Sequence, residues 1–404
     1  MTNDDTKQQS VFDEDALAAM AARDWVRACE LWARAREKRP SNLRAHSAGL
    51  EALVRAYRFE EAFTLADTLA ERFAGRAEAD LAIAALRTRQ GRWAEAAEQY
   101  EAIASRSEKL ADRVARLPTY RQAVFNAYGI LAGSRRLPIS LHQPEQSSFR
   151  NRKCGYVFVS GMPRAGTTAL GHLLSIRQDV ALFTELHNPY LTYAPNSFAL
   201  DVVNAKRSRL PSVATEQILE RATEASFIGD KRPLFHYSIP HTLEMMKDYR
   251  LTVLHVLRNP VLVAASYQRR AADPEDEWDP LRDLGNCIDE FNVMHQFLLD
   301  WADIAVAQGH QVIYVDYEQV FRDPDYAVGL FQAIGVTDPE ASRGAIIRFQ
   351  EASVSALTKE RKIDPDIRAA VMKGLDHEVA NRVSALTGID VTVRQLDLAT
   401  KSTA

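Results

Sequence analysis

A short glycine-containing turn between an apolar strand and an apolar helix is the feature that most constrains the fold of this chain. The run at residues 156–160 is mostly β-branched and aromatic and predicts a buried strand. Gly161 and Gly166 follow, and an apolar-periodic helix begins at Thr167 or Thr168. In such a turn backbone N–H groups converge, and the helix dipole adds about half a positive charge. The sequence therefore predicts an anion-binding turn.

The turn departs from a nucleotide-hydrolase loop at one position. Its glycine and threonine spacing is that of a phosphate-binding P-loop, but Thr167 stands where the P-loop lysine is expected. The nearest cation is Arg164, three residues earlier. Arginine forms bidentate, charge-assisted bonds with anions of this shape and needs no metal. The turn is poorly equipped for a magnesium-bound triphosphate, and we expect no metal.

Length and composition set broad limits. The chain has 404 residues, more than one typical core holds, which predicts two domains. A net charge of -4 argues against a general nucleic-acid binder. Cys29, Cys154 and Cys287 show no metal-type or disulfide-type pairing. The first ten residues lack the apolar core of a signal peptide and no apolar run is long enough to span a membrane, so we expect a cytoplasmic protein.

Residues 11–108 repeat with a period of 34. Aromatic residues recur at Trp25, Phe59 and Trp93. Further sets at the same spacing lie on one helical face, namely Ala28, Ala62 and Ala96; Trp32, Ala66 and Tyr100; and Ala35, Leu69 and Ile103. This period is typical of tetratricopeptide repeats, in which paired helices stack into a solenoid. The repeats can bind a protein partner, self-associate or cap the following domain, and their small number favours a cap or dimerisation role.

Composition and periodicity divide the rest of the chain. Residues 1–10 are interpreted as a disordered tail, 109–153 as a helical linker, 154–390 as an α/β domain and 391–404 as a C-terminal tail. In the α/β domain strands alternate with helices through short turns, which predicts a parallel sheet covered on both faces. Ligands bind such folds at the carboxyl ends of the strands. Four charged residues directly follow predicted strands, and we expect them on one rim: Arg164, Glu185, Lys231 and Arg258.

Two motifs in this domain together carry a family resemblance. Gly161–Thr168, with Arg258 and Ser266 downstream, resembles the sulfotransferases that use 3′-phosphoadenosine 5′-phosphosulfate (PAPS). The resemblance covers about residues 155–335 and includes the segment Val315–Pro324. In that family the first motif holds the 5′-phosphosulfate. An arginine and a serine eight residues later, the spacing seen here, hold the 3′-phosphate.

The resemblance implies a P-loop-like sulfotransferase domain that moves a sulfonyl group from PAPS, without a metal, to a hydroxyl acceptor. The acceptor class stays open among carbohydrates, protein tyrosine and small molecules. The implied donor-binding residues are Arg164, Ala165, Gly166, Thr167, Thr168, Arg258 and Ser266. Arg164 also acts in catalysis by clamping the phosphosulfate, because sulfonyl transfer depends mainly on positioning and electrostatic stabilisation.

The resemblance also implies the residues that handle the acceptor. Glu185 is the candidate general base, and His187 is the rival base because histidine titrates near neutrality. Lys231 resembles the lysine that meets the sulfonyl group or the bridging oxygen. Arg232 is the adjacent alternative for that role, and an ion pair of Lys231 with Asp230 is the purely structural reading.

Two other functions are weighed against a sulfotransferase. A P-loop kinase or other nucleotide enzyme remains open because Asp316 follows a predicted strand. A repeat-based interaction protein with an inactive catalytic domain is the second alternative, and the retained charged residues argue against it. The basic run Thr358–Lys362 is interpreted as a solvated turn, with closure over the nucleotide through Lys359 or Arg361 as its functional reading.

Overall fold

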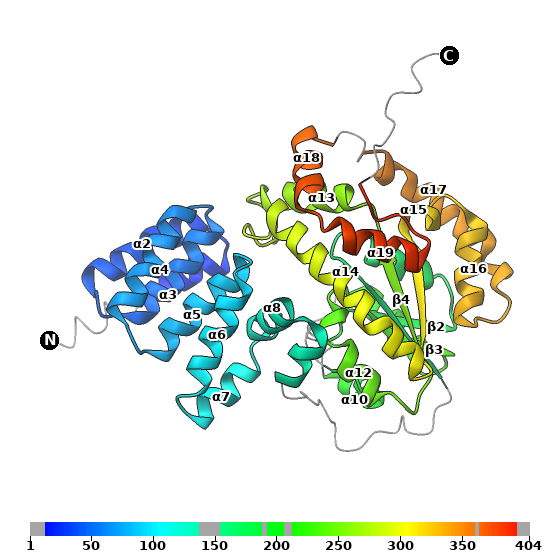
Figure 1. Ribbon diagram of the computed structural model, residues 1–404, viewed down its shortest axis with the longest axis horizontal. Helices are drawn as coiled ribbons and strands as arrows, with labels where there is room; N and C mark the ends of the chain where they lie inside the picture. Colours follow the sequence, from blue (N-terminus) through cyan, green and yellow to red (C-terminus); the bar gives the residue numbers. More distant parts are fainter. Residues whose placement is uncertain (1–12, 137–153, 188–191, 206–211, 360–362, 394–404) are drawn as a thin grey trace, which may run out of the picture. The chain divides into compact units, whose positions relative to one another are not determined.

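The computed structural model describes residues 13–136, 154–187, 192–205, 212–359 and 363–393 (Figure 1). Residues 1–10, Arg361 and most of the expected C-terminal tail lie outside this range. The chain forms two compact units: Met1–Ala127 with Tyr267–Asn286, and Tyr128–Ser266 with Cys287–Ala404. We call them the helical unit and the sheet unit. The prediction of a helical region followed by an α/β domain is confirmed.

The helical unit consists of antiparallel helix pairs in the predicted register. A helix at residues 13–21 comes first, and one helix of each later pair begins at Trp25, Phe59 or Trp93. The helices are α2 (Trp25–Lys38), α3 (Leu43–Arg55), α4 (Phe59–Arg72), α5 (Ala77–Arg89), α6 (Trp93–Ala104), α7 (Glu108–Ala115) and the first part of α8 (Pro118–Arg136), which continues past the unit boundary at Ala127. These helices fit a repeat domain. α8 carries a non-helical backbone at Gly129 and occupies part of the expected linker.

The 34-residue period extends to the backbone of the turns. The residue two positions before each repeat's first aromatic residue has a left-handed backbone: φ is 59° at Arg23, 60° at Tyr57 and 75° at Gly91. This conformation costs a non-glycine residue about 1 kcal/mol or more. The turns that precede α2, α4 and α6 therefore share one backbone conformation, which keeps the stack of helix pairs regular.

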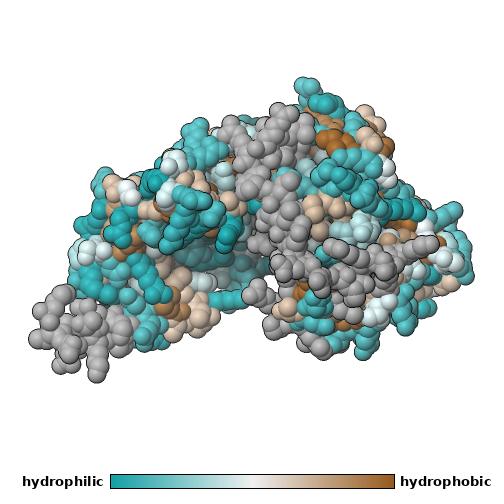
Figure 2. Space-filling model, turned by 90° about the horizontal axis from the view of Figure 1, so that it is seen from below, coloured by the Kyte–Doolittle hydropathy of each residue, from teal (hydrophilic) through white to brown (hydrophobic). Residues whose placement is uncertain are grey.

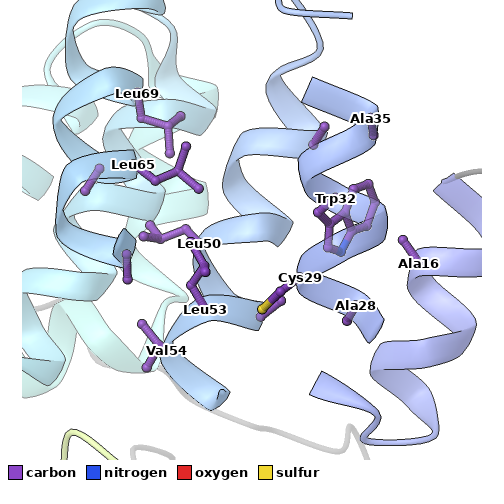
Figure 3. Packing of buried hydrophobic residues seen from close by; sticks show 14 of the residues in the cluster. Ala16, Ala28, Cys29, Trp32, Ala35, Leu50, Leu53, Val54, Leu65 and Leu69 are labelled. Atoms are coloured by element: carbon purple, nitrogen blue, oxygen red, sulfur yellow. The ribbon is translucent and has the colours of Figure 1, made fainter. Parts of the chain in front are cut away.

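Side chains that share one helical face form the core of this unit. The period identified twelve positions. Nine of them, from Ala28, Trp32 and Ala35 and their equivalents in the next two repeats, are at least 92% buried, whereas Trp25, Phe59 and Trp93 are partly exposed. Trp32 is fully buried and projects from α2 towards Ala16 of the preceding helix, while Leu50 and Leu53 of α3 lie opposite Leu65 of α4 (Figure 3). The indole N–H of Trp32 donates to the sulfur of Met20 at 3.2 Å.

The sheet unit is built on five parallel strands in the order β2-β3-β1-β4-β5. Their bounds are β1 (Gly155–Gly161), β2 (Val180–Thr184), β3 (Phe227–Lys231), β4 (Leu251–Leu257) and β5 (Gln311–Asp316). β1 and β4 are almost entirely buried, as their continuous apolar sequences predict. The order places β1, which leads into the glycine turn, at the centre.

Helices connect the five strands and continue after β5. They are α9 (Thr167–Leu174), α10 (Leu200–Asn204), α11 (Ser212–Ala222), α12 (Ile239–Met245), α13 (Pro260–Ala271), α14 (Leu284–Ala307), α15 (Tyr317–Val320), α16 (Pro324–Ile334), α17 (Arg343–Lys359), α18 (Pro365–Gly374) and α19 (His377–Thr387). The periodicity of residues Asp366–Thr387 predicts a single helix, and that prediction is wrong. Leu375 is extended and the Asp376 side chain accepts from Val379 N–H, which starts a new helix.

Strand alternation separates two charged neighbours at the end of β3. Asp230 lies on the sheet face of its register partner Phe158, which stacks on Phe235 at 4.5 Å between ring centroids. Lys231 lies on the opposite face, where its Cγ is 3.4 Å from the position of a Cβ on Gly171 of α9. The two side chains therefore serve different environments.

The described surface is mostly hydrophilic on the face in Figure 2, with scattered apolar residues. Within the described residues no helix combines the length and apolar character needed to cross a bilayer.

Candidate active site

The carboxyl ends of the five strands carry the candidate residues. Arg164 follows β1, Glu185 follows β2, Lys231 ends β3 and Arg258 follows β4. β5 leads into Tyr317 at the start of α15. Because all strands are parallel, these residues share one edge of the sheet, as expected for ligand sites in such folds. The strand order puts Glu185 and Lys231 on one side of β1 and Arg258 on the other.

The turn after β1 is held in a conformation that few sequences accept. φ is 68° at Arg164 and 102° at Gly166. A Cβ on Gly166 would lie 2.0 Å from the Tyr317 ring, and one on Gly161 would lie 2.7 Å from the Val256 carbonyl oxygen. Both glycines are therefore required by close approach as well as by backbone angle.

The first turn of α9 faces this loop without a capping side chain. Gly166 is the N-cap residue and contributes no side-chain acceptor. Thr167 is buried at 2% exposure and Thr168 is exposed, while Ala165 is buried beneath the turn. Backbone N–H groups at such a helix start are oriented towards an anion. The cofactor-binding residues expected between 165 and 168 thus form one continuous turn.

Arg164 contacts both Arg258 and Ser266, although it lies 94 and 102 residues from them in sequence. Arg164 Nε donates to Ser266 Oγ at 3.1 Å, and Arg258 Nη1 donates to the Arg164 carbonyl oxygen at 3.0 Å. Ser266 lies in α13, whose first residue is Pro260, as the sequence predicts, and whose first turn is capped by the Asn259 side chain. Arg258 and Ser266 are both buried, with 6% and 3% of their surface exposed.

Two residues that follow β5, Tyr317 and Glu318, contact the Arg258 side chain. The Arg258 guanidinium carbon lies 4.2 Å from the Tyr317 ring centroid, a cation–π geometry. Its Nε lies 3.7 Å from Glu318 Oε1. Burial raises the pKa of Glu318, and the charge of Arg258 opposes that shift. Sequence reasoning noted this segment as part of the resemblance but assigned neither residue a role.

Glu185 and Lys231 form a close ion pair at the other side of β1. Lys231 Nζ donates to Glu185 Oε1 at 2.6 Å, and Glu185 N–H donates to the Lys231 carbonyl at 3.0 Å. The lysine side chain is 3% exposed and the glutamate side chain 57% exposed. Glu185 has φ of 54°, a strained value of the kind found at functional turns. Lys231 pairs with Glu185, so the expected alternative pairing with Asp230 does not occur.

A buried polar network lies beneath this pair. Tyr193 OH and Leu186 N–H both donate to the Asp230 carboxylate, the latter at 3.1 Å. Arg232 is 1% exposed, donates to the His187 carbonyl oxygen and lies 3.5 Å from Asp230 Oδ2. Burial raises the pKa of Asp230 against the lowering effect of Arg232. Arg232 is thus engaged in holding the Glu185 loop.

His187 belongs to the same buried layer. It is 4% exposed, and its Nε2 donates to the Ser197 carbonyl at 2.8 Å. Glu185, two residues earlier, is on the surface of the loop. No sequence pattern identified Tyr193 as the partner of Asp230, because the two residues are 37 positions apart.

Asp316, which kept the kinase alternative open, caps a helix. Its Oδ1 accepts from Glu318 N–H at 2.9 Å and from Gln319 N–H at 3.2 Å. The residue is therefore explained as the N-cap of α15.

Comparison with known families assigns the domain that carries these residues. Residues 157–338 match the family model described as "Sulfotransferase family". This match covers 182 of the 404 residues, and this region of the chain resembles the sulfotransferase family. The resemblance found in the sequence is therefore confirmed at the level of the family, and the matched residues of the sulfotransferase domain include all the candidate site residues.

Two solved structures are similar to this chain. The sulfotransferase domain from the Synechococcus PCC 7002 olefin synthase is 17% identical, with 61% of this chain and 100% of that chain covered and a TM-score of 0.37. The sulfotransferase STF9 from Mycobacterium avium is 15% identical, with 70% and 85% covered and a TM-score of 0.33. No curated protein matches the chain.

Proposed function

We propose that the sulfotransferase domain transfers a sulfonyl group from PAPS to a hydroxyl acceptor. The contact that carries the proposal is that of Arg164 Nε with Ser266 Oγ at 3.1 Å, beside Arg258. It joins the turn suited to a 5′-phosphosulfate and the helix suited to a 3′-phosphate in one cluster. A donor with anionic groups at both ends of one nucleoside fits such a pair of sites.

Each end of the donor has its own ligands in this proposal. Arg164 and the N–H groups of residues 165–168 bind the 5′-phosphosulfate. Arg258 and Ser266 bind the 3′-phosphate, and the Tyr317 ring, 4.2 Å from the Arg258 guanidinium carbon, supports that side chain. On donor binding, the contacts between Arg164, Arg258 and Ser266 give way to contacts with the donor oxygens, which satisfy the same hydrogen-bond donors.

Glu185 accepts the proton of the acceptor hydroxyl. The acceptor oxygen then attacks sulfur in line, the bond between sulfur and the 5′-phosphate oxygen breaks, and adenosine 3′,5′-bisphosphate leaves. Lys231, 2.6 Å from Glu185, stabilises the negative charge that develops on the transferring group and the leaving oxygen. We prefer Glu185 to His187 as the base because His187 is buried and already donates to a carbonyl.

The proposal keeps the acceptor classes open: a carbohydrate, a protein tyrosine or a small molecule. The chemistry runs without a metal and in the cytoplasm, where the absence of disulfide-type cysteine pairing fits reduced thiols. Thr167 at the lysine position and Asp316 as a helix cap both disfavour the kinase alternative.

Incubation with PAPS labelled in its sulfur, together with a cell extract, tests this proposal. Wild-type protein should move the label to an acceptor in the presence of EDTA, and Arg164→Ala should abolish transfer. Arg177→Ala removes an arginine of the same unit that pairs with Asp179, and it should leave transfer unchanged. Magnesium-dependent consumption of ATP without transfer of the labelled sulfonyl group would establish the nucleotide-enzyme alternative instead.

A further inference from the structure

The connection between α13 and α14 belongs to the helical unit, although it interrupts the sulfotransferase domain in sequence. We call residues 272–283 the connecting segment. Residues 267–286, which include it, form one compact unit with Met1–Ala127. The last residue of α13 on the sheet-unit side of this division is Ser266, the candidate 3′-phosphate ligand. The residue after Ser266, Tyr267, is therefore the first of this stretch that belongs to the helical unit.

Arg89, the last residue of α5, is the main anchor of the connecting segment. Its Nε and Nη2 donate to the two carboxylate oxygens of Asp279 at 2.7 and 2.9 Å. Its Nη1 donates to Glu51 of α3 at 2.5 Å, and its carbonyl oxygen accepts from Asn286 at 2.9 Å. The Arg89 side chain is only 18% exposed. A bidentate arginine–carboxylate pair with this burial fixes both distance and orientation.

Arg55 provides a second anchor from α3. Its Nη1 donates to the backbone carbonyls of Glu277 and Trp278 at 3.3 and 3.2 Å. Glu51 holds it in turn, with Oε1 accepting from Arg55 Nε at 3.0 Å. One carboxylate, Glu51, therefore orients both arginines that grip the connecting segment.

The connecting segment folds back on the C-terminal half of α13. Arg270 of α13 pairs with both carboxylate oxygens of Asp276 at 2.6 and 2.5 Å. The Trp278 ring lies 4.9 Å from the guanidinium carbons of Arg270 and Arg282 and meets Tyr267 edge-on at 4.9 Å. Contacts thus continue without interruption from Arg89 to Tyr267, the residue after Ser266.

We propose that the helical repeats act as an intramolecular clamp that positions α13 for donor binding, with Arg89 as the positioning residue. The inference rests on the proposed function, because Ser266 must act as a 3′-phosphate ligand for the position of α13 to matter. Residues on one helix move together, so release of the clamp displaces Ser266 from its hydrogen-bond distance to the donor. Small misplacements of a binding group weaken binding and slow reaction. The repeats thereby gain a role within the chain instead of a role in partner binding alone.

Arg89→Ala tests the clamp, with Arg92→Ala as the matched control. Arg92 is an arginine three residues later whose side chain is 49% exposed and pairs only locally with Glu95 in the described structure. Hydrogen exchange reports the order of residues 267–283. Calorimetric titration with adenosine 3′,5′-bisphosphate and with adenosine 5′-monophosphate separates the 3′-phosphate from the rest of the ligand.

Arg89→Ala should speed exchange in residues 267–283 and raise the Kd for the bisphosphate about 3- to 10-fold, while the Kd for the monophosphate changes less than about 2-fold. Arg89→Lys should fall between wild type and alanine because it keeps the charge and loses the bidentate geometry. Arg92→Ala should match wild type. If Arg89→Ala loses its helical circular dichroism, Asp279→Asn makes the same test from the connecting segment.

Faster exchange with an unchanged bisphosphate Kd would overturn the coupling, and unchanged exchange would overturn the clamp itself. Equal weakening of both nucleotides would show general damage to the fold and would also overturn the positioning role. Wild-type protein that binds neither nucleotide would refute the proposed function. Wild-type protein that binds the bisphosphate as tightly as Arg89→Ala does would refute only the clamp.

Discussion

The helical unit and the sheet unit differ in how far apart in sequence their contacting residues lie. In the helical unit each core position recurs after 34 residues, and the neighbours that it contacts lie within the same pair or the next. In the sheet unit the candidate site combines residues that follow different strands with Ser266 of α13, and Arg164 and Ser266, which are in contact, are 102 positions apart. Regular local contacts make a fold recognisable from its period, whereas a site depends on strand order that no local pattern records.

The sheet unit should show the largest effect when its exposed candidate base is changed. Glu185→Gln keeps the shape and the hydrogen bond to Lys231 but removes proton acceptance. We expect kcat to fall about 10²- to 10⁴-fold with unchanged affinity for adenosine 3′,5′-bisphosphate. Steady-state sulfotransfer and calorimetric titration measure both quantities, and Glu224→Gln, an exposed carboxylate of the same unit, is the control. A comparable loss in His187→Ala but not in Glu185→Gln would assign the base to histidine.

The helical unit should respond most strongly in its periodic core. Trp32→Ala removes a fully buried side chain that packs against Ala16 and Met20, and should lower the free energy of unfolding by about 3–5 kcal/mol. Urea denaturation followed by circular dichroism measures this loss. Val26→Ala, at a side chain 65% exposed on the same helix, should change it by less than about 1 kcal/mol. Equal effects of the two changes would contradict the assigned packing.

Gly166→Ala combines the backbone and packing constraints of the anion turn. The added Cβ would lie 2.0 Å from the Tyr317 ring, and the alanine would have to adopt the φ of 102° that Gly166 has. We expect a strain of about 1–3 kcal/mol, which should raise the Kd for PAPS by about 5-fold or more. Gly329→Ala, in the interior of α16 with open space around its Cβ, should instead leave binding unchanged and slightly stabilise the helix. Wild-type affinity in Gly166→Ala would show that the turn is not the donor site.

Acid should destabilise the sheet unit through two buried histidines. Burial lowers the pKa of His255 and His295 to about 3, whereas an unfolded histidine titrates near pH 6.5. Between these values the unfolded chain binds protons that the folded chain does not, so stability falls as pH falls below about 6.5. The slope should be about 1.4 kcal/mol per pH unit for each histidine. His255→Leu should reduce the measured slope between pH 6 and 5 by that amount, and an unchanged slope would refute the assignment.

The sequence predicted a helical repeat region followed by an α/β domain with a parallel sheet, and the residues at four strand ends. It could do so because periodicity, glycine turns and apolar runs are local signals. It could not predict that Lys231 pairs with Glu185 while Asp230 faces Tyr193, since alternation at the end of β3 sends the two neighbours to opposite sides of the sheet. The break at Leu375 was missed because α18 and α19 continue one apparent helical period.

The contacts between the connecting segment and the repeats could not be predicted from the sequence either. Arg89 and Asp279 are 190 positions apart, and neither stands in a motif. Both are ordinary charged residues by sequence, and only the fold brings them together as a partly buried pair. Interactions of this kind explain why the repeats could be recognised from their period while their role could not.

Titration with adenosine 3′,5′-bisphosphate and adenosine 5′-monophosphate, on wild type and Arg258→Ala, tests the donor site most directly. The account predicts that wild type binds the bisphosphate more tightly, and that Arg258→Ala weakens it about 10- to 100-fold while weakening the monophosphate less than about 3-fold. Equal loss for both ligands, or no preference of wild type for the bisphosphate, would contradict the assignment of Arg258 and Ser266 to the 3′-phosphate.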